Sequence, residues 1–182
     1  MVLKAVDEKE LELLHILDAI VRQKSAMIEP IVLRVEHRLT QDPESSLAWE
    51  PVPLALYGDK LPDIIRSSWV FVLRALTNTG PERHPNSHQR MMSYRGLGDL
   101  QVRAGDGWRS NSLVSSQDAL IQNRWISISP NTWHRAIVSE ENWAVVSFHT
   151  VGEGELIEER PDKSDAGLMH QRKYMETSHY QT

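Results

Sequence analysis

A succession of short segments rich in aromatic and β-branched residues fills the middle of the chain, and this pattern constrains the fold more than any other feature. The clearest of them, residues 67–75 (SSWVFVLRA), has the composition of a β-strand. Similar segments follow at residues 89–95, 99–104, 108–114, 124–129, 132–138 and 143–150. Gly105-Asp106-Gly107 lies between two of them and predicts a hairpin turn, because glycine accepts positive φ. Many short strands without intervening helices predict an all-β antiparallel barrel or jelly roll, not an α/β fold.

The first 48 residues have a different composition and predict helix. All six Trp and both Phe lie between residues 49 and 148, whereas apolar residues recur at helical spacing from Leu13 to Val21 and from Met27 to Leu39. Pro30 interrupts the second run, so we expect two helices with a break or kink near residues 25–30. Asp7, followed by Glu10, predicts a capping box at the start of the first helix.

These changes in composition divide the chain into three expected parts. Residues 1–45 form an N-terminal helical segment, residues 46–158 a β-barrel domain that opens with a Pro-rich loop, and residues 159–182 a polar tail. We expect the tail to be a surface arm or partly disordered. The helical segment is expected to cover the main core, and it is also compatible with a homodimer interface.

Composition excludes several classes of function. The net charge of −5 argues against a nucleic-acid binder, and no apolar run approaches the ~18 residues of a membrane span. No signal-peptide pattern is present at the N-terminus, so a cytoplasmic location is expected. The absence of Cys excludes disulfides, thiolate zinc sites, iron–sulfur clusters and a Cys nucleophile. Any metal or proton shuttle must therefore use His and carboxylates.

The histidines that lie near predicted strands are the candidates for chemistry. Four others, His15, His37, His170 and His179, are expected at the surface, and His149 follows an apolar strand and is expected to be a hydrogen-bonded wall residue. Glu82 and His84 would share one face of an extended segment, a geometry that Pro85 favours. With a second imidazole from a distant strand they would give two His and one carboxylate. That set is associated with non-haem Fe(II) oxygenases, and Mn²⁺, Ni²⁺ or Zn²⁺ also fits it.

The segment 123–134 (NRWISISPNTWH) resembles the second sequence motif of the cupin family, in which a Gly, a Pro and a second Gly precede a metal-binding His. Asn123 and Asn131 stand at the two Gly positions, Ser129 at the Pro position and His134 at the His position. Because Asn tolerates left-handed backbone geometry, the turn remains feasible.

The segment upstream resembles the first cupin motif, which has His-x-His followed by a Glu and a Gly. Counting back from Gly96 places Glu82 at the first His, His84 at the second and Gln89 at the Glu. The resemblance covers roughly residues 65–150. Its spacing is also similar to that of the thiol-dioxygenase branch of the cupins, which likewise lacks the Glu.

The resemblance implies a cupin-type antiparallel double-stranded β-barrel (jelly roll) with a divalent ion inside. Glu82, His84 and His134 are the ligand set that best fits strand parity. A set of His84, His88 and His134, with or without Gln89, requires a loop that turns His88 inward, and a barrel that has lost its metal is the third possibility. The neutral Gln89 amide would be a weaker ligand than the family's Glu.

The expected function is that of a metal-binding cupin, foremost a non-haem Fe(II) dioxygenase of a small organic substrate. The alternatives are a non-catalytic small-ligand-binding or sensor cupin, and a metal-dependent isomerase or lyase. A fold hosts many functions, so the resemblance predicts a site and not a reaction.

Overall fold

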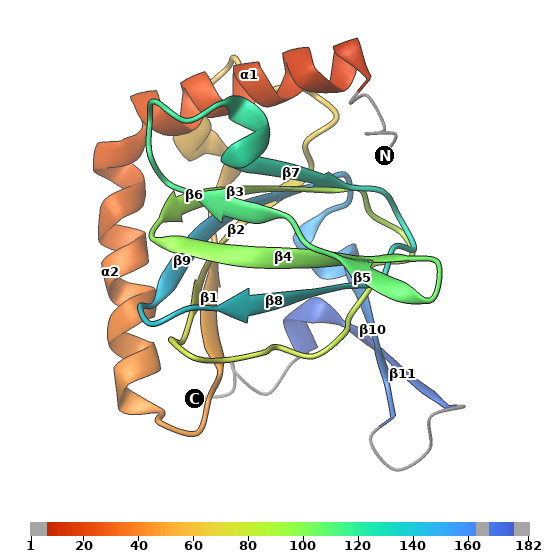
Figure 1. Ribbon diagram of the computed structural model, residues 1–182. Coiled ribbons are helices and arrows are strands. Elements are labelled where there is room, and N and C mark those ends of the chain that lie inside the picture. Colours follow the sequence, from red (N-terminus) through yellow and green to blue (C-terminus); the bar gives the residue numbers. More distant parts are fainter. Residues whose placement is uncertain (1–6, 163–167, 177–182) are drawn as a thin grey trace.

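Two antiparallel β-sheets and two N-terminal helices make up most of the computed structural model, which describes residues 7–162 and 168–176 (Figure 1). The helices are α1 (Glu8–Gln23) and α2 (Ser25–Gln41). The strands are β1 (Leu47–Pro51), β2 (Ser67–Leu73), β3 (Gln89–Arg95), β4 (Leu97–Ala104), β5 (Gly107–Arg109), β6 (Ser112–Val114), β7 (Trp125–Ile128), β8 (His134–Val138), β9 (Trp143–His149), β10 (Ile157–Pro161) and β11 (Met169–Lys173). The prediction of an all-β fold preceded by helices is confirmed.

The strand order is not the order of the chain, as expected for a jelly roll. The five-stranded sheet has the order β1-β2-β9-β3-β7. In the second sheet β4 pairs with β8 along one edge and with β5 and β6 along the other. A separate pair, β10 and β11, projects away from the helices (Figure 1). The result is a double-sheet β-sandwich in which neighbouring strands often come from distant parts of the chain.

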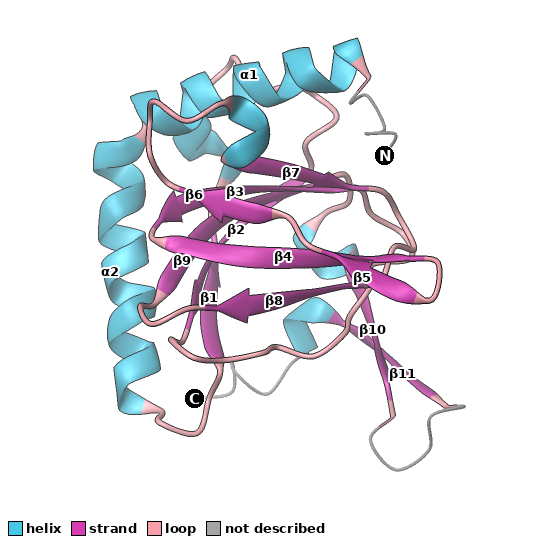
Figure 2. Cartoon of the chain, viewed as in Figure 1, coloured by secondary structure: helices cyan, strands magenta, loops and turns pink. Residues whose placement is uncertain are grey.

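Strand alternation gives the molecule two packed layers. Met91 of β3 packs between the two sheets with Leu100, whereas its neighbour Met92 packs on the helical side. There the apolar stripes of α1 and α2, such as Leu17 and Val35, cover the outer face of the five-stranded sheet. Figure 2 shows both long helices on one side of the strands. The inner face of the five-stranded sheet therefore faces the second sheet and lines the space between them.

The two helices form as predicted, with two differences in detail. The break falls at Lys24, and Pro30 lies inside α2, where its missing N–H only costs the bond to the carbonyl four residues earlier. The capping box is wrong: the Asp7 side chain accepts from the backbone N–H of Lys9, and the Glu10 carboxylate binds Arg90 instead. Glu10 therefore forms a long-range ion pair with Arg90 and does not cap the start of α1.

Three differences concern the strands. β1 lies where a loop was expected, because its pairing with β2 outweighs the Pro residues around it. The segment expected as one strand at 108–114 is split into β5 and β6, which pair end to end with β4. β11 lies in the expected polar tail; its side chains are exposed, and its backbone pairing with β10 gives it strand geometry. None of the helices in the described part of the chain is long and apolar enough to cross a membrane.

Candidate metal centre

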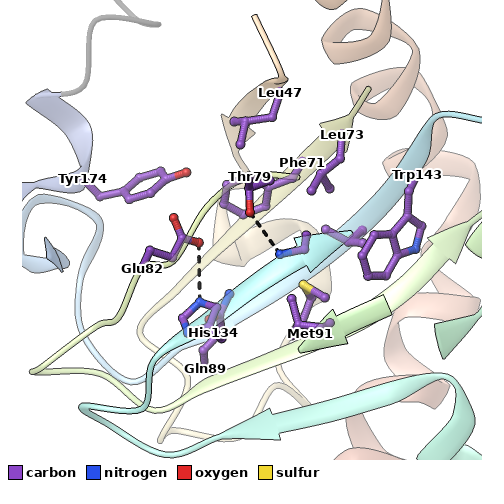
Figure 3. Close-up of a pocket in the computed structure, with 13 residues that line it drawn as sticks. Leu47, Phe71, Leu73, Thr79, Glu82, Gln89, Met91, His134, Trp143 and Tyr174 are labelled. Atoms are coloured by element: carbon purple, nitrogen blue, oxygen red, sulfur yellow. Dashed lines mark hydrogen bonds and ion pairs between the residues drawn. The ribbon is translucent and has the colours of Figure 1, made fainter. Parts of the chain in front are cut away.

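Glu82, His84 and His134 come together inside the sandwich, although they are up to 52 positions apart in the sequence (134 minus 82). Each offers one ligand atom, and these atoms all lie within 4.8 Å of one another. His84 and His134 are 4% and 2% exposed. Figure 3 shows Glu82 and His134 pointing toward each other at one side of a pocket.

The segment that carries Glu82 and His84 is extended, as its sequence predicted. Glu82 forms a backbone bridge with His134 of β8, and Arg83 forms one with Glu159 of β10. Side chains alternate along this segment, so Arg83 points the other way, where it binds the Glu159 carboxylate at 2.6 Å. The two ligand candidates therefore share one face because the chain is extended between two neighbouring strands.

The turn before β8 positions His134. Asn131 has a φ of 66°, the left-handed geometry expected at the second glycine position of the cupin motif. Its backbone N–H donates to the carbonyl oxygen of His84 at 2.9 Å. This bond ties the turn of the second motif to the strand of the first.

Hydrogen bonds to the backbone orient both imidazoles. The Nδ1 of His84 lies 3.0 Å from the carbonyl oxygen of Ile157, and the Nδ1 of His134 lies 3.0 Å from that of Thr132. Because a carbonyl only accepts, each Nδ1 carries a proton, and a neutral ring with this tautomer has its lone pair on Nε2. The Nε2 of His134 is buried, has no hydrogen-bond partner among the described residues, and lies 3.4 Å from the Glu82 carboxylate. A cation bound between this nitrogen and the carboxylate would contact both groups.

The local electrostatics keep Glu82 and His84 in the protonation states that a metal needs. Burial alone would raise the pKa of Glu82, but the guanidinium of Arg160 and the imidazole of His134 outweigh it and hold the pKa well below its ordinary value. Burial and the neighbouring His134 lower the pKa of His84 to about 4. At neutral pH the carboxylate is therefore ionised and His84 is neutral, the states required of metal ligands.

A small cavity adjoins Glu82 and His134. Its volume is about 40 Å³, counted as the space open to the centre of a water molecule, which is room for roughly three waters. The apolar lining consists of Leu47, Phe71, Leu73, Met91, Leu100, Ala136, Trp143 and Val145. The polar lining consists of Thr79, Glu82, Gln89, His134 and Tyr174. In Figure 3 Tyr174 and Glu82 lie at one side and Trp143 at the other.

The structure places the other residues considered from the sequence in different surroundings. His88 lies away from the cavity, with its Nε2 2.6 Å from the Ser127 hydroxyl and 3.8 Å from Glu10 of α1, so the structure does not bring it to His84 and His134. Gln89 does line the cavity, because it alternates with Arg90, whose side chain binds Glu10 on the helical side. His149 is a buried wall residue, hydrogen-bonded at both ring nitrogens to serine hydroxyls.

Two residues near the centre were not expected from the sequence. Arg160 of β10 pairs with Glu82 and also with Glu158, at 2.9 Å in the latter case. Tyr174 follows β11, is 5% exposed and packs its ring against His84 with centroids 6.2 Å apart. Both lie in the segment interpreted as a polar tail, and Tyr174, one of two tyrosines in that segment, was the available signal. The β10–β11 pair is thus part of the site's enclosure.

Comparisons with known proteins were made at the level of sequence and structure. No protein-family model matches this sequence, and no curated protein matches it. Pumpkin seed globulin aligns with a TM-score of 0.48 and 16% identity, over 63% of this chain and 28% of that one. The capsular polysaccharide assembling protein CapF from Staphylococcus aureus aligns with a TM-score of 0.41 and 12% identity, over 48% and 23%. Oxalate oxidase in complex with glycolate aligns with a TM-score of 0.43 and 15% identity, over 58% and 51%.

This chain spans about a quarter to a half of the length of these proteins. The chain itself is a jelly-roll β-sandwich: two antiparallel sheets face each other, and a left-handed turn at Asn131 delivers His134 to the interior. Within that fold, Glu82, His84 and His134 form a possible metal site.

Proposed function

We propose that this protein is a metal-dependent enzyme, a non-haem Fe(II) dioxygenase of a small organic substrate. The observation that carries the proposal is the geometry of the two imidazoles. Both are held by Nδ1–H bonds to backbone carbonyls, so that their Nε2 lone pairs and the Glu82 carboxylate converge. Hydrogen bonds of this kind fix the tautomer of metal-ligating histidines.

The donor set favours a particular group of metals. Two imidazole nitrogens and one carboxylate leave coordination positions open, which suits Fe(II) oxygenases, although Mn²⁺, Ni²⁺ and Zn²⁺ accept the same donors. A bound Fe(II) would supply redox chemistry and open positions beside the cavity.

The chain's own residues provide the surroundings for such chemistry. Trp143, Leu100 and Val145 give the cavity an apolar wall that excludes bulk water and accepts a compact substrate. Glu82 and His134 hold their positions through the backbone bridge between them. A substrate of a few heavy atoms would therefore be oriented mainly by shape, next to the ligand set.

One observation favours a second candidate, a non-catalytic cupin that binds a small ligand without metal. The Arg160 guanidinium already pairs with Glu82, so the carboxylate has a counter-ion from the chain itself. In that case the cavity and its apolar wall would serve recognition only. The two candidate functions therefore differ in whether Glu82 stays paired with Arg160 or binds a metal ion instead.

Metal uptake tests the proposal. The purified chain is reconstituted anaerobically with Fe(II), desalted and assayed for metal by elemental analysis, together with His84→Ala and His134→Ala. We expect the wild-type chain to retain one ion that both variants lose. His88→Ala and the exposed His15→Ala are matched controls, and both should retain the ion.

A wild-type chain that retains no metal would overturn the proposal and leave the ligand-binding candidate. Retention by His84→Ala would reject this ligand set, whereas loss of the ion in both His84→Ala and His88→Ala would favour the alternative set of His84, His88 and His134. For the redox assignment, nitric oxide added to the Fe(II) form should give the electron paramagnetic resonance signal of an Fe–NO adduct. If the Fe(II)-loaded protein gives no such signal, the iron has no open coordination position, and the dioxygenase proposal is wrong.

A further inference from the structure

A buried amide on the cavity wall has an acceptor atom that the described protein residues leave without a partner. Gln89 is 5% exposed and lines the same cavity as Glu82 and His134. Its Oε1 is buried and has no hydrogen-bond partner among the described residues. Leaving such an atom unpaired costs about 1–3 kcal/mol, so a buried orphan needs an explanation.

A chain of hydrogen bonds sets the orientation of this amide. Gln89 Nε2 donates to the Ser147 hydroxyl at 3.2 Å, and that oxygen lies 3.0 Å from Nε2 of His149. The other nitrogen of His149 lies 3.1 Å from the hydroxyl of Ser87, which donates to the backbone carbonyl of His88. All these contacts are satisfied when His149 donates from Nδ1 and accepts from Ser147 at Nε2. The amide nitrogen then faces Ser147, and Oε1 is left for the cavity.

The other polar groups of the cavity point to the kind of ligand that this atom would bind. The carboxylate of Glu82 and the Oε1 of Gln89 are hydrogen-bond acceptors, and the other polar groups of the lining are the hydroxyls of Thr79 and Tyr174 and the imidazole of His134. No Lys or Arg is among the residues that line the cavity, and the indole N–H of Trp143 is already bonded to Ser93 at 2.9 Å. Next to the Oε1 of Gln89 a carboxylate oxygen would meet a second acceptor, whereas an N–H or O–H group would donate a hydrogen bond to it.

We infer that Gln89 is a substrate-binding residue whose Oε1 accepts a hydrogen bond from an N–H or O–H group. The substrate class is a compact, neutral, protic molecule, such as a small amide or alcohol, whose remaining surface is apolar. This inference deepens the proposed function and rests on it, because the metal at Glu82, His84 and His134 would hold the other end of the ligand. Gln89 thereby selects protic ligands over carboxylates.

Formamide and formate provide a matched pair of probes, since they have the same shape and differ in carrying an NH₂ group or a second anionic oxygen. Each is titrated into the Co(II)-loaded protein, and binding is followed by the visible absorption of the ion. Gln89→Met keeps the length of the side chain and removes the acceptor, and the exposed Gln122→Met is the control. We expect Gln89→Met to weaken formamide binding by roughly fivefold, the effect of one hydrogen bond. Formate binding should be unchanged or tighter, and Co(II) affinity unchanged.

Three results would overturn the inference. One is an unchanged ratio of formamide to formate affinity in Gln89→Met. Another is a loss of Co(II) affinity in this variant as large as in His84→Ala, which would make Gln89 a ligand. If Gln89→Met does not fold, Ser147→Ala replaces it, because it releases the amide nitrogen and should reduce the same ratio. A folded Ser147→Ala protein that keeps the ratio would be the third.

Failure of the proposed function gives a different result from failure of this inference. A wild-type chain that binds no Co(II) overturns the metal site. Formamide is then titrated into the metal-free wild-type and Gln89→Met proteins and followed by thermal shift. If formamide raises the melting temperature of the wild-type protein and not that of Gln89→Met, the role of Gln89 is supported. Equal shifts in both proteins overturn that role.

Discussion

Glu82 and His134 exchange two backbone hydrogen bonds, with N···O distances of 2.9 and 2.8 Å, and their side chains meet again 3.4 Å apart in the cavity. The backbone pair fixes both Cα atoms, so the carboxylate and the imidazole cannot separate without opening the sheet. His134 donates from Nδ1 to a backbone carbonyl, and its Nε2 therefore faces the carboxylate. The fold thus holds together two groups that a cation would stabilise.

Arg160 is expected to stabilise the metal-free protein and to weaken its affinity for metal. Its guanidinium pairs with both Glu82 and Glu158, and its side chain is 28% exposed. In Arg160→Met both carboxylates lose this partner, so the free energy of unfolding should fall by about 2 kcal/mol after allowance for solvent screening. Removal of a competing positive charge should raise Co(II) affinity roughly tenfold. Urea unfolding and a competitive metal titration measure the two effects.

Arg172→Met is the matched control for this prediction. Arg172 also binds Glu158, at 2.8 Å, but is 43% exposed, and no contact joins it to Glu82 in the described structure. Its substitution should leave the Co(II) affinity unchanged. Equal metal affinities in Arg160→Met and wild type would show that Arg160 does not compete for Glu82.

The metal-free protein should lose stability as the pH falls from about 6.5 toward about 4. Burial and the neighbouring imidazole of His134 lower the pKa of His84 to about 4, and burial with neighbouring imidazoles lowers the pKa of His149 well below its ordinary value. In the unfolded chain both imidazoles titrate near ~6.5. The unfolded chain therefore binds more protons in this range, so stability is complete above it and falls as the pH decreases.

Urea unfolding at about pH 7 and about pH 5 measures the effect, which should be on the order of 2 kcal/mol for each of the two imidazoles. His149→Gln should reduce the dependence on pH, whereas the exposed His15→Gln should not. A stability that is constant over this interval would contradict the low pKa values.

Most of the strands could be predicted from the sequence because their signal is local. In β2 and β9, aromatic and β-branched residues are concentrated in short runs, and both strands are buried almost throughout. The same signal is absent from β11, whose residues are polar and exposed and whose geometry depends on pairing with β10. A strand that is stabilised mainly by backbone pairing has no side-chain pattern from which it could be predicted.

The residues of the candidate site differ in the same way: some have a local sequence signal and others do not. Glu82 and His84 could be placed on one face from their spacing, and the turn before His134 from the tolerance of Asn131 for positive φ. Arg160 could not be assigned to the site, because the contact with Glu82 spans 78 positions and depends on where β10 lies. Long-range ion pairs of this kind have no local sequence signature.

Gly98→Ala should destabilise the protein and disturb the cavity. A Cβ at Gly98 would lie 2.2 Å from Cε3 of Trp143, a fully buried ring that forms part of the cavity wall. The ring is rigid and closely packed, so we expect a loss of about 2–3 kcal/mol in the free energy of unfolding. Gly107→Ala is the control, since nothing lies within 4 Å of the added Cβ. Equal unfolding midpoints for the two variants would mean that the Trp143 ring moves without cost.

Asn131 and Asn123 occupy the two positions where the cupin motif has glycine, and the structure predicts opposite responses to Gly there. Asn131 has a φ of 66°, whereas Asn123 ends a short 3-10 helix and is not among the described non-glycine residues with positive φ. Asn131→Gly should therefore preserve stability, and Asn131→Ala should cost about 1–2 kcal/mol. Asn123→Gly should lose about 0.5–1 kcal/mol, because it adds flexibility without relieving strain.

Thermal unfolding of the three variants measures these differences, and a Co(II) titration of each shows whether the turn also positions His134. The backbone of Asn131 bonds to the carbonyl of His84, so a distorted turn should separate the two imidazoles. We expect weaker Co(II) binding in Asn131→Ala and unchanged binding in Asn131→Gly. If Asn131→Ala binds Co(II) as tightly as Asn131→Gly does, the left-handed turn contributes to stability alone and the β8 bridge to Glu82 is sufficient to hold His134 in place.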